Sequence, residues 1–188
     1  MSALAQSSCT PEQYLILERQ ANYKSEYVSG GIFAMAGASK EHNQIAFNLA
    51  GELHSQLKNR PCLAYLNDLR VKVSATGLYT YPDVAALCDE PDFEDAHMDT
   101  LLNPSVIIEI LSPSTEAYDR GDKFAHYRRL PSLMEYVLIA QDKVRIEHYI
   151  RQDKQWVLTE MDHLDDMLCL VSIQCEIPLR EIYAKIEY

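Results

Sequence analysis

The sequence predicts a mixed α/β fold in which a central β-sheet carries helices on its faces. Two observations support this. Short apolar and β-branched runs typical of strands alternate along the chain with segments of helical period. One long amphipathic segment, residues 40–57, separates two groups of such runs. A chain that returns repeatedly from helix to strand packs its helices against a sheet.

The length and composition are typical of one globular domain. The chain has 188 residues, of which 47% are hydrophobic and 24% charged. We therefore expect a single domain over residues 1–188, with residues 1–10 as a flexible N-terminal segment. No apolar stretch approaches the length of a membrane span, and the N-terminus lacks the basic start and apolar core of a signal peptide. A soluble, cytoplasmic protein without membrane contacts is expected.

Charge and cysteine usage restrict the function classes. The net charge of -11 repels a polyanion and argues against a DNA-binding protein that relies on a basic surface. A nuclease needs only a local basic rim, and the acids gather in two expected solvated loops, residues 89–99 and 162–166. The five cysteines are scattered and form no Cys-x-x-Cys pair. This opposes a disulfide framework and a zinc site and predicts that most are reduced and buried.

The first elements follow from local signals. Residues 10–18 predict a short helix, because a threonine N-cap precedes a proline at the first helical position. Residues 23–28 and 32–36 predict two strands that pair across the glycine turn between them. Residues 40–57 predict a long helix, because apolar residues recur every four positions. We expect this helix to cover one face of the sheet.

The later elements are mostly strands. Strands are expected at residues 63–66, 69–73, 80–87, 106–111, 135–139, 144–150 and 156–159. The apolar runs at residues 80–87 and 106–111 are expected to be central in the sheet.

A helix is expected after residues 106–111. It begins at a cap at residues 114–115 and carries Asp119, Lys123 and Tyr127. Judged alone, Lys123 is explained by a solvated helix face with local ion pairs.

Two carboxylates lie within or beside apolar strands. Asp83 opens the apolar run of residues 84–87, and Glu109 interrupts that of residues 106–111. A buried carboxylate must be protonated, paired or bound to a cation, because its desolvation is costly. Two of them directed at one point predict a divalent metal site, and Mg²⁺ needs few protein ligands when a substrate phosphate completes its shell. Phosphodiester hydrolysis fits this pattern. Judged alone, Asp83 is also explained as a strand-start residue that binds backbone amides.

Five further residues are secondary candidates. Glu26 would complete the acidic cluster from the first strand pair, although a cross-strand charge pair at the surface explains it nearly as well. His42 and Asn43 open the long helix, where backbone amides favour an anion such as phosphate, and helix capping is the simpler explanation. Asp68 and Arg70 are candidates for a substrate rim.

A series of short motifs runs in a fixed order along nearly all of the chain. The motifs are residues 10–14, 24–30, 35–43, 68–73, 81–84, 103–104, 109–119, 123–124, 127–128, 131–133 and 135–136. Each is weak alone, and together they are specific. On these motifs the chain resembles the Uma2 family of restriction-endonuclease-like proteins, part of the PD-(D/E)xK nuclease superfamily. The resemblance implies a restriction-endonuclease-like mixed central β-sheet flanked by helices.

The resemblance also implies a set of site residues. The superfamily pattern places a lysine two residues after the second acid, where this chain has Leu111. Lys123 on the following helix is expected to take its place. In this reading Asp83, Glu109 and the backbone carbonyl of Ile110 bind the metal. Lys123 orients the attacking water or neutralises charge on the phosphate.

The sequence therefore predicts an enzyme, a Mg²⁺-dependent endonuclease that hydrolyses DNA, with Mn²⁺ as a substitute metal. A non-catalytic binding or self-assembly module with the same fold is the alternative, favoured by the acidic composition and by Leu111. Hydrolysis of RNA or another phosphodiester is a third reading, because no motif fixes the sugar. Cutting two strands needs two centres, which favours a homodimer, whereas a monomer that nicks one strand satisfies the same motifs.

Overall fold

The chain begins with a helix and a β-hairpin, as the sequence predicts. The computed structural model describes residues 9–187. Helix α1 (Pro11–Glu18) starts with a capping box, in which the Thr10 hydroxyl accepts from the Gln13 N–H and the Gln13 side chain accepts from the Thr10 N–H. Strands β1 (Ser25–Val28) and β2 (Gly31–Ala34) then pair antiparallel. The predicted flexibility of residues 1–10 falls largely on residues 1–8, outside the described part.

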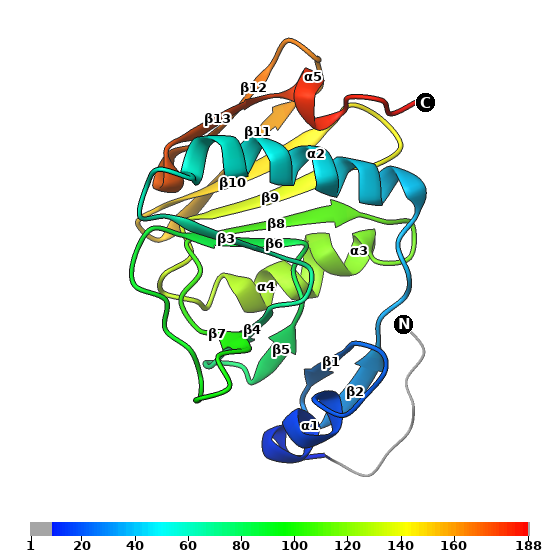
Figure 1. Cartoon of the computed structure of the whole chain (residues 1–188), viewed down its shortest axis with the longest axis vertical. Coiled ribbons are helices and arrows are strands. Elements are labelled where there is room, and N and C mark those ends of the chain that lie inside the picture. The colour runs from blue at the N-terminus through cyan, green and yellow to red at the C-terminus, as the bar shows by residue number, and fades with distance from the viewer. Residues whose placement is uncertain (1–8, 188) are drawn as a thin grey trace.

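The hairpin belongs to the smaller of two main sheets. This five-stranded sheet has the order β2-β1-β5-β4-β7. Its remaining strands are β4 (Arg70–Val73), β5 (Leu78–Thr80) and β7 (Thr100–Leu101). In Figure 1 the α1–β1–β2 unit lies at one end of the molecule and is joined to the rest by the segment that leads into the long helix α2 (Lys40–Leu57).

The larger sheet is mixed, as predicted. Its six strands have the order β11-β10-β9-β8-β6-β3. They are β3 (Leu63–Leu66), β6 (Val84–Leu87), β8 (Val106–Leu111), β9 (Glu135–Ala140), β10 (Ile146–Gln152) and β11 (Gln155–Met161). The central strands β8 and β9 run parallel, and the other neighbours run antiparallel.

Helices cover both faces of this sheet (Figure 1). On one side lies α2, and on the other lie α3 (Glu116–Tyr118), a π-helix (Asp119–Lys123) and α4 (Phe124–Tyr127). The alternation of side chains along β8 divides the core between them. Ile108 and Ile110 pack in the cluster that holds α2, whereas Ile107 and Leu111 pack in the cluster that holds α4. Glu109 therefore points to the α4 side.

The C-terminal part adds elements that the sequence did not predict. Strands β12 (Met167–Leu170) and β13 (Cys175–Pro178) form a hairpin through a 3-10 turn (Val171–Ile173), and α5 (Leu179–Ile182) follows. Their buried side chains belong to the same core cluster as those of α2. Within residues 9–187 no helix is both long and apolar enough to cross a membrane.

The strand expected at residues 80–87 is wrong as a single element. The chain leaves the five-stranded sheet after Thr80 and enters the six-stranded sheet at Val84. Pro82 lies between them, where its ring cannot donate a ladder hydrogen bond. The break places Asp83 between the two sheets.

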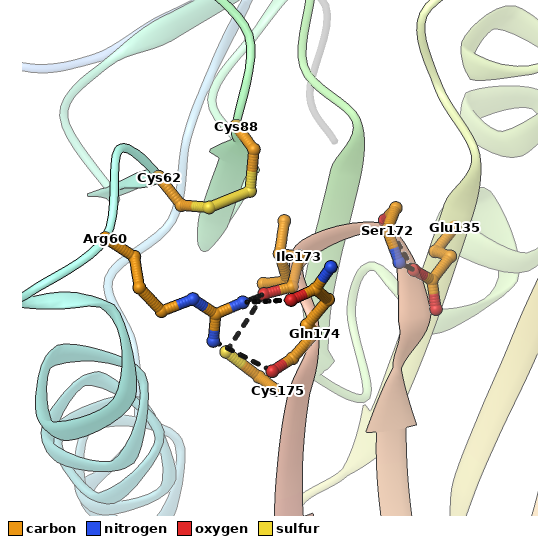
Figure 2. The surroundings of a disulfide bond; sticks show 8 residues. All are labelled: Arg60, Cys62, Cys88, Glu135, Ser172, Ile173, Gln174 and Cys175. Carbon is orange, nitrogen blue, oxygen red and sulfur yellow. Dashed lines mark hydrogen bonds between the residues drawn. A yellow bond between two sulfur atoms is a disulfide. The ribbon is translucent and has the colours of Figure 1, made fainter.

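The cysteine prediction is wrong at one pair. Cys62, just before β3, and Cys88, just after β6, form a disulfide (Figure 2). Cys169 is free but exposed, whereas Cys175 is free and buried as expected. Sequence spacing did not reveal the pair, because antiparallel pairing of β3 with β6 brings together residues that are 26 positions apart.

Two buried or half-buried polar groups hold the turn beside this disulfide. Arg60 donates from its guanidinium to the backbone carbonyls of Ile173 and Gln174. Glu135, at the start of β9, accepts from the backbone and hydroxyl of Ser172 (Figure 2). These contacts connect the segment after α2 and the large sheet to the C-terminal hairpin.

Candidate active site

Asp83 is positioned by the antiparallel pairing of β6 with β8. Val84 lies opposite Ile108, so the preceding residue, Asp83, comes level with Glu109. The Asp83 Oδ2 atom accepts a 2.7 Å hydrogen bond from the Ile110 N–H. The backbone-amide contact that explains Asp83 alone is thus present, and it fixes the carboxylate at the edge of β8 beside the second acid.

Glu109 is buried on the α4 side of β8, as the strand alternation requires. Its Oε1 atom accepts a 2.9 Å hydrogen bond from the Tyr127 hydroxyl. The same oxygen lies 2.9 Å from Lys123 Nζ. The helix after β8 therefore does return to the strand, as expected, and supplies both partners of the carboxylate.

Lys123 closes the π-helical segment and is almost fully buried. Besides Glu109, its Nζ lies 3.3 Å from Glu26 Oε1 and 3.4 Å from Asp119 Oδ1. The solvated-face explanation does not describe this lysine, whose side chain is 6% exposed. A π-helical turn is rare, and such turns are frequent at functional sites.

Glu26 belongs to this cluster and is not a surface residue. It is buried in β1, where the Thr80 hydroxyl of the neighbouring strand donates to its Oε1 atom. The surface cross-strand pair considered from the sequence is therefore not its environment. Glu26 brings a carboxylate of the five-stranded sheet to a lysine packed against the six-stranded sheet.

The cluster has a surplus of negative charge. Burial, strengthened by the charges of Asp119 and Asp83, raises the pKa of Glu109 well above its usual value against the opposing effect of Lys123. Burial also raises the pKa of Asp119. Burial alone would lower the pKa of Lys123, but Glu109 and Glu26 hold that pKa well above its ordinary value. The site therefore favours an additional proton or cation.

These residues open into one cavity of about 530 Å³. Asp83, Glu109 and Lys123 all line it, so the structure brings the three predicted catalytic residues together. Its walls come from the segment 34–38 before α2 and from the loop after β8. The lining also includes Lys24, Glu26, His42, Asn43, Asp68, Ser112, Ser114, Thr115, Tyr118 and Asp119.

His42 and Asn43 lie in the first turn of α2, as expected. The N-cap is Ser39, whose hydroxyl accepts from the His42 N–H at 3.0 Å. Asn43 donates to the Ser39 carbonyl at 2.7 Å, so its contact is with the capping backbone. The His42 ring instead reaches the site, with Nε2 3.2 Å from Asp83 Oδ2.

The two residues expected at a substrate rim lie in different environments. Asp68 lines the cavity and pairs with Lys24 at 2.9 Å. Arg70 is buried away from the cavity lining, where it contacts Asp99 and donates a 2.8 Å hydrogen bond to the Tyr81 hydroxyl. Asp99 was expected in a solvated loop, and its pairing explains why Arg70 is not free to bind a substrate.

Sequence reasoning did not assign a site role to Asp119, Tyr118 or Tyr127. Asp119 and Tyr127 each lie four positions from Lys123, a spacing that places side chains on one helix face. This spacing was the available signal. Tyr118, the last residue of α3, also lines the cavity, but it lies five positions before Lys123, a spacing that gives no such signal.

A metal would find hard oxygen donors here. Within residues 9–187, the hydrogen bonds of Asp83 and Glu109 use Oδ2 and Oε1, and Oδ1 and Oε2 accept no hydrogen bond from the protein. Across the same residues no three His, Cys, Asp or Glu side chains are arranged to hold a metal. The donor set therefore fits only a metal that keeps several waters, as Mg²⁺ does.

The chain is similar to other proteins along nearly all of its length. The family model described as "Uma2: Putative restriction endonuclease" matches residues 11–179. An uncharacterized protein of Synechocystis sp. (strain PCC 6803) is 41% identical over 153 residues, covering 81% of this chain and 86% of that protein. A second from the same organism is 37% identical over 175 residues, covering 93% and 90%.

A solved structure has the same fold. It is a crystal structure described as "a putative nuclease belonging to DUF820" from Anabaena variabilis, with a TM-score of 0.77 and 20% sequence identity. The superposition covers 95% of this chain and 99% of that one. The predicted fold class is confirmed.

Proposed function

The chain belongs to the Uma2 family, and from this premise we propose that it is a metal-dependent endonuclease that hydrolyses DNA phosphodiester bonds. The proposed metal is Mg²⁺, with Mn²⁺ as a substitute. Asp83, Glu109 and the backbone carbonyl of Ile110 are its proposed ligands, and Lys123 is the proposed catalytic cation. A cytoplasmic location remains part of the proposal.

One observation carries this proposal. Asp83 and Glu109 line one cavity, each has a carboxylate oxygen that accepts no hydrogen bond in the described chain, and the surrounding cluster has surplus negative charge. A group of desolvated carboxylates is stabilised by a cation. Asp83 and Glu109 would hold a divalent ion, and its charge would offset the surplus.

The backbone of β8 supports the third ligand. The Ile110 N–H points to Asp83, and the N–H and C=O of one strand residue point to the same side. The Ile110 carbonyl is therefore on the side of β8 that carries Asp83. Carbonyl and carboxylate oxygens together form the hard donor set that Mg²⁺ prefers.

The protein side chains have separate roles in this mechanism. A bound Mg²⁺ would supply an acidified water and polarise the phosphate. Tyr127 and Lys123 hold Oε1 of Glu109, leaving Oε2 for the metal. His42 and the Ile110 N–H hold Asp83 in the same way. The Lys123 charge offsets negative charge that develops on the phosphate, a contact worth ~2.7–4 kcal/mol of barrier.

A non-catalytic binding or self-assembly module is the second candidate. Lys123 already contacts three carboxylates, so part of the charge is compensated without a metal. A scaffold of this kind would bind no Mn²⁺ at Asp83 and Glu109. The two candidates therefore differ in metal binding as well as in activity.

The test combines metal binding with cleavage. Mn²⁺ binding is measured by calorimetry, and cleavage of supercoiled plasmid and circular single-stranded DNA is followed at low salt with Mg²⁺ or Mn²⁺. Asp83→Asn, Glu109→Gln and Lys123→Met are compared with Asp142→Asn and Lys143→Met, whose side chains are exposed outside the cavity. The proposal expects the first three to lose cleavage and the two carboxylate variants to lose Mn²⁺. A parent chain that binds no Mn²⁺ and cuts neither DNA supports the scaffold.

The oligomeric state follows from the substrate. Cleavage of both strands of a duplex needs two centres and therefore a homodimer, whereas cleavage of one strand needs only one. Light scattering under the cleavage conditions gives the mass of the parent chain in solution. Comparing that mass with the number of strands cut in the products tests this part of the proposal.

A further inference from the structure

We infer that the proposed site acts on single-stranded nucleic acid, with one strand entering the cavity, and not on an intact duplex. The inference rests on the proposed nuclease function and names its substrate class. Four features carry it: the depth and size of the cavity, an aromatic side chain beside the catalytic cluster, a group of hydroxyls on the cavity wall, and the charge of the protein around it.

The reacting groups lie at the bottom of the cavity. The side chains of Glu109 and Lys123 are only 5% and 6% exposed, and Asp83 is 16% exposed. The scissile phosphate must therefore enter the cavity to reach them. Its volume of about 530 Å³ is within the ~300–1,000 Å³ that holds one small molecule. A strand segment of one or two nucleotides is of this size.

A duplex meets this requirement only at an energetic cost. Double-stranded DNA is stiff, with a persistence length of ~150 base pairs, so bringing one of its phosphates into a recess requires bending or local unpairing. A single strand has no partner strand to exclude and bends freely. Enzymes that bring a nucleotide into an enclosed pocket accordingly act on single strands or pay to extrude the nucleotide.

The wall of the cavity provides a surface for a base. The ring of Tyr118 lies beside the cluster, with Lys123 Nζ 6.0 Å from its centroid. In the described chain, Tyr118 stacks on no other aromatic ring, unlike Tyr127 and Phe124, which both pack against Tyr136. Aromatic side chains beside a strand path stack on bases without regard to sequence. Tyr118 is therefore the proposed base platform.

Hydroxyl groups on the cavity wall are suited to contact the sugar–phosphate backbone of a strand. Ser112, Ser114 and Thr115 line the cavity, and their hydroxyls share hydrogen bonds of 2.9–3.0 Å with each other. Such hydroxyls contact phosphate and sugar oxygens in protein–nucleic acid complexes. They provide polar contacts without adding positive charge.

The charges of the chain oppose duplex binding. Duplex recognition depends on several lysines and arginines that neutralise phosphates, and the chain has a net charge of -11. Both cavity lysines, Lys24 and Lys123, are paired with carboxylates. Several arginines are also paired with carboxylates of the protein itself: Arg19, Arg70, Arg120, Arg145 and Arg180. A single strand is also a polyanion, but stacking on Tyr118 supplies a contact that needs no free lysine or arginine.

The test compares strandedness at constant sequence. The parent chain with Mn²⁺ is given a circular single-stranded DNA, the relaxed closed duplex of the same sequence, and a single-stranded RNA. The inference expects the single-stranded DNA to be cut at least 10-fold faster than the relaxed duplex. Equal rates on the two DNAs overturn it while leaving the nuclease function intact. Cleavage of the RNA alone supports single-strand entry and replaces DNA as the proposed substrate.

Two variants test the base platform. Tyr118→Leu removes the ring, and Tyr118→Phe keeps it. Tyr23→Leu is the matched control, because Tyr23 is 60% exposed and does not line the cavity. We expect Tyr118→Leu to raise KM for the single strand about 10-fold with a smaller effect on kcat, from the usual size of base–aromatic stacking. Tyr118→Phe should keep KM close to that of the parent, because the ring remains, and Tyr23→Leu should match the parent in KM and kcat. An unchanged KM in Tyr118→Leu rejects the platform.

Binding separates this inference from the proposed function. Fluorescence anisotropy with labelled single-stranded and duplex oligonucleotides is measured with Ca²⁺ in place of Mn²⁺. Single-strand binding at least 10-fold tighter than duplex binding, without cleavage in any condition, supports the strand preference and rejects the nuclease. Equal binding of both forms overturns the strand preference.

Discussion

The hydroxyl of Tyr127 donates a 2.9 Å hydrogen bond to Oε1 of Glu109, the same oxygen that Lys123 contacts at 2.9 Å. Both donors come from one turn of the chain after β8, at positions four residues apart. Burial raises the pKa of Tyr127 well above its ordinary value, so its hydroxyl stays protonated and remains a donor. Glu109 is therefore held by one neutral and one charged donor.

Removing only the Tyr127 hydroxyl should lower both the unfolding free energy and the affinity for Mn²⁺. Tyr127→Phe leaves the ring packing in place and takes one hydrogen bond from a buried carboxylate, which costs about 2 kcal/mol of unfolding free energy. A loss of ~10-fold in Mn²⁺ affinity is expected, as for other partners of metal ligands. Urea unfolding and calorimetry measure the two effects. Tyr65→Phe is the control, because its hydroxyl makes no hydrogen bond within residues 9–187. Equal behaviour of the two variants would contradict the role of Tyr127.

Removing the Lys123 charge should make stability depend on pH. Lys123→Met leaves buried carboxylates without their cation, and breaking a buried pair costs ~3–5 kcal/mol. Without the cation, the already raised pKa values of Glu109 and Asp119 rise further. A raised folded-state pKa contributes stability in acid that is lost as the pH rises through that value. The deficit of the variant should therefore be smaller at pH 5 than at pH 8. Urea unfolding at both pH values measures it, and a deficit that does not change with pH rejects this account.

The contact between His42 and Asp83 should matter for metal binding more than for stability. His42 Nε2 lies 3.2 Å from Asp83 Oδ2, and the His42 side chain is partly accessible from the cavity. His42→Ala should lower Mn²⁺ affinity by ~10-fold or more, because partners that orient a metal ligand commonly have effects of this size. His42→Gln retains a donor and should recover part of the affinity. Calorimetric titration measures the Mn²⁺ affinity of both variants. His54→Ala is the control, because His54 is exposed on the same helix outside the cavity.

The disulfide should stabilise the chain under oxidising conditions only. It closes a loop of 26 positions between Cys62 and Cys88, for which chain-entropy estimates give about 3–4 kcal/mol. Cys88→Ser should lose this stability without reductant and match the parent with dithiothreitol. Cys169→Ser, which changes an exposed free thiol, should behave as the parent in both conditions. Disulfides are rare in reducing compartments, so mass spectrometry of protein alkylated during lysis also bears on the cytoplasmic location.

Local and periodic signals predicted most of the fold. The threonine–proline start defined α1, the four-residue period defined α2, and the apolar run of residues 106–111 predicted a buried strand that contains Glu109. Asp83, Glu109 and Lys123 were expected at one site and do line one cavity. These successes share a cause, because each depends on residues close in sequence or on the resemblance in motif order.

The rest depended on contacts between distant segments. Nothing local at Arg70 indicated that Asp99 would occupy its guanidinium, and nothing at Cys62 indicated Cys88. The π-helical turn over Asp119–Lys123 departs from the ordinary helical period, so the inward direction of Tyr118 could not be read from spacing. The C-terminal hairpin was missed because its short strands carry exposed residues beside buried ones without a clear turn signal.

The position of Glu26 gives the first hairpin a role beyond packing. This hairpin is a small unit at one end of the molecule, yet it supplies one of the three carboxylates around Lys123 (Figure 1). Any displacement of β1 would change the electrostatic potential at the lysine and, through it, the charge balance at Glu109. Fragments that begin at α2 would lack this carboxylate. Boundaries for expression or fusion should accordingly be chosen upstream of α1, since the candidate site includes a residue of the N-terminal unit.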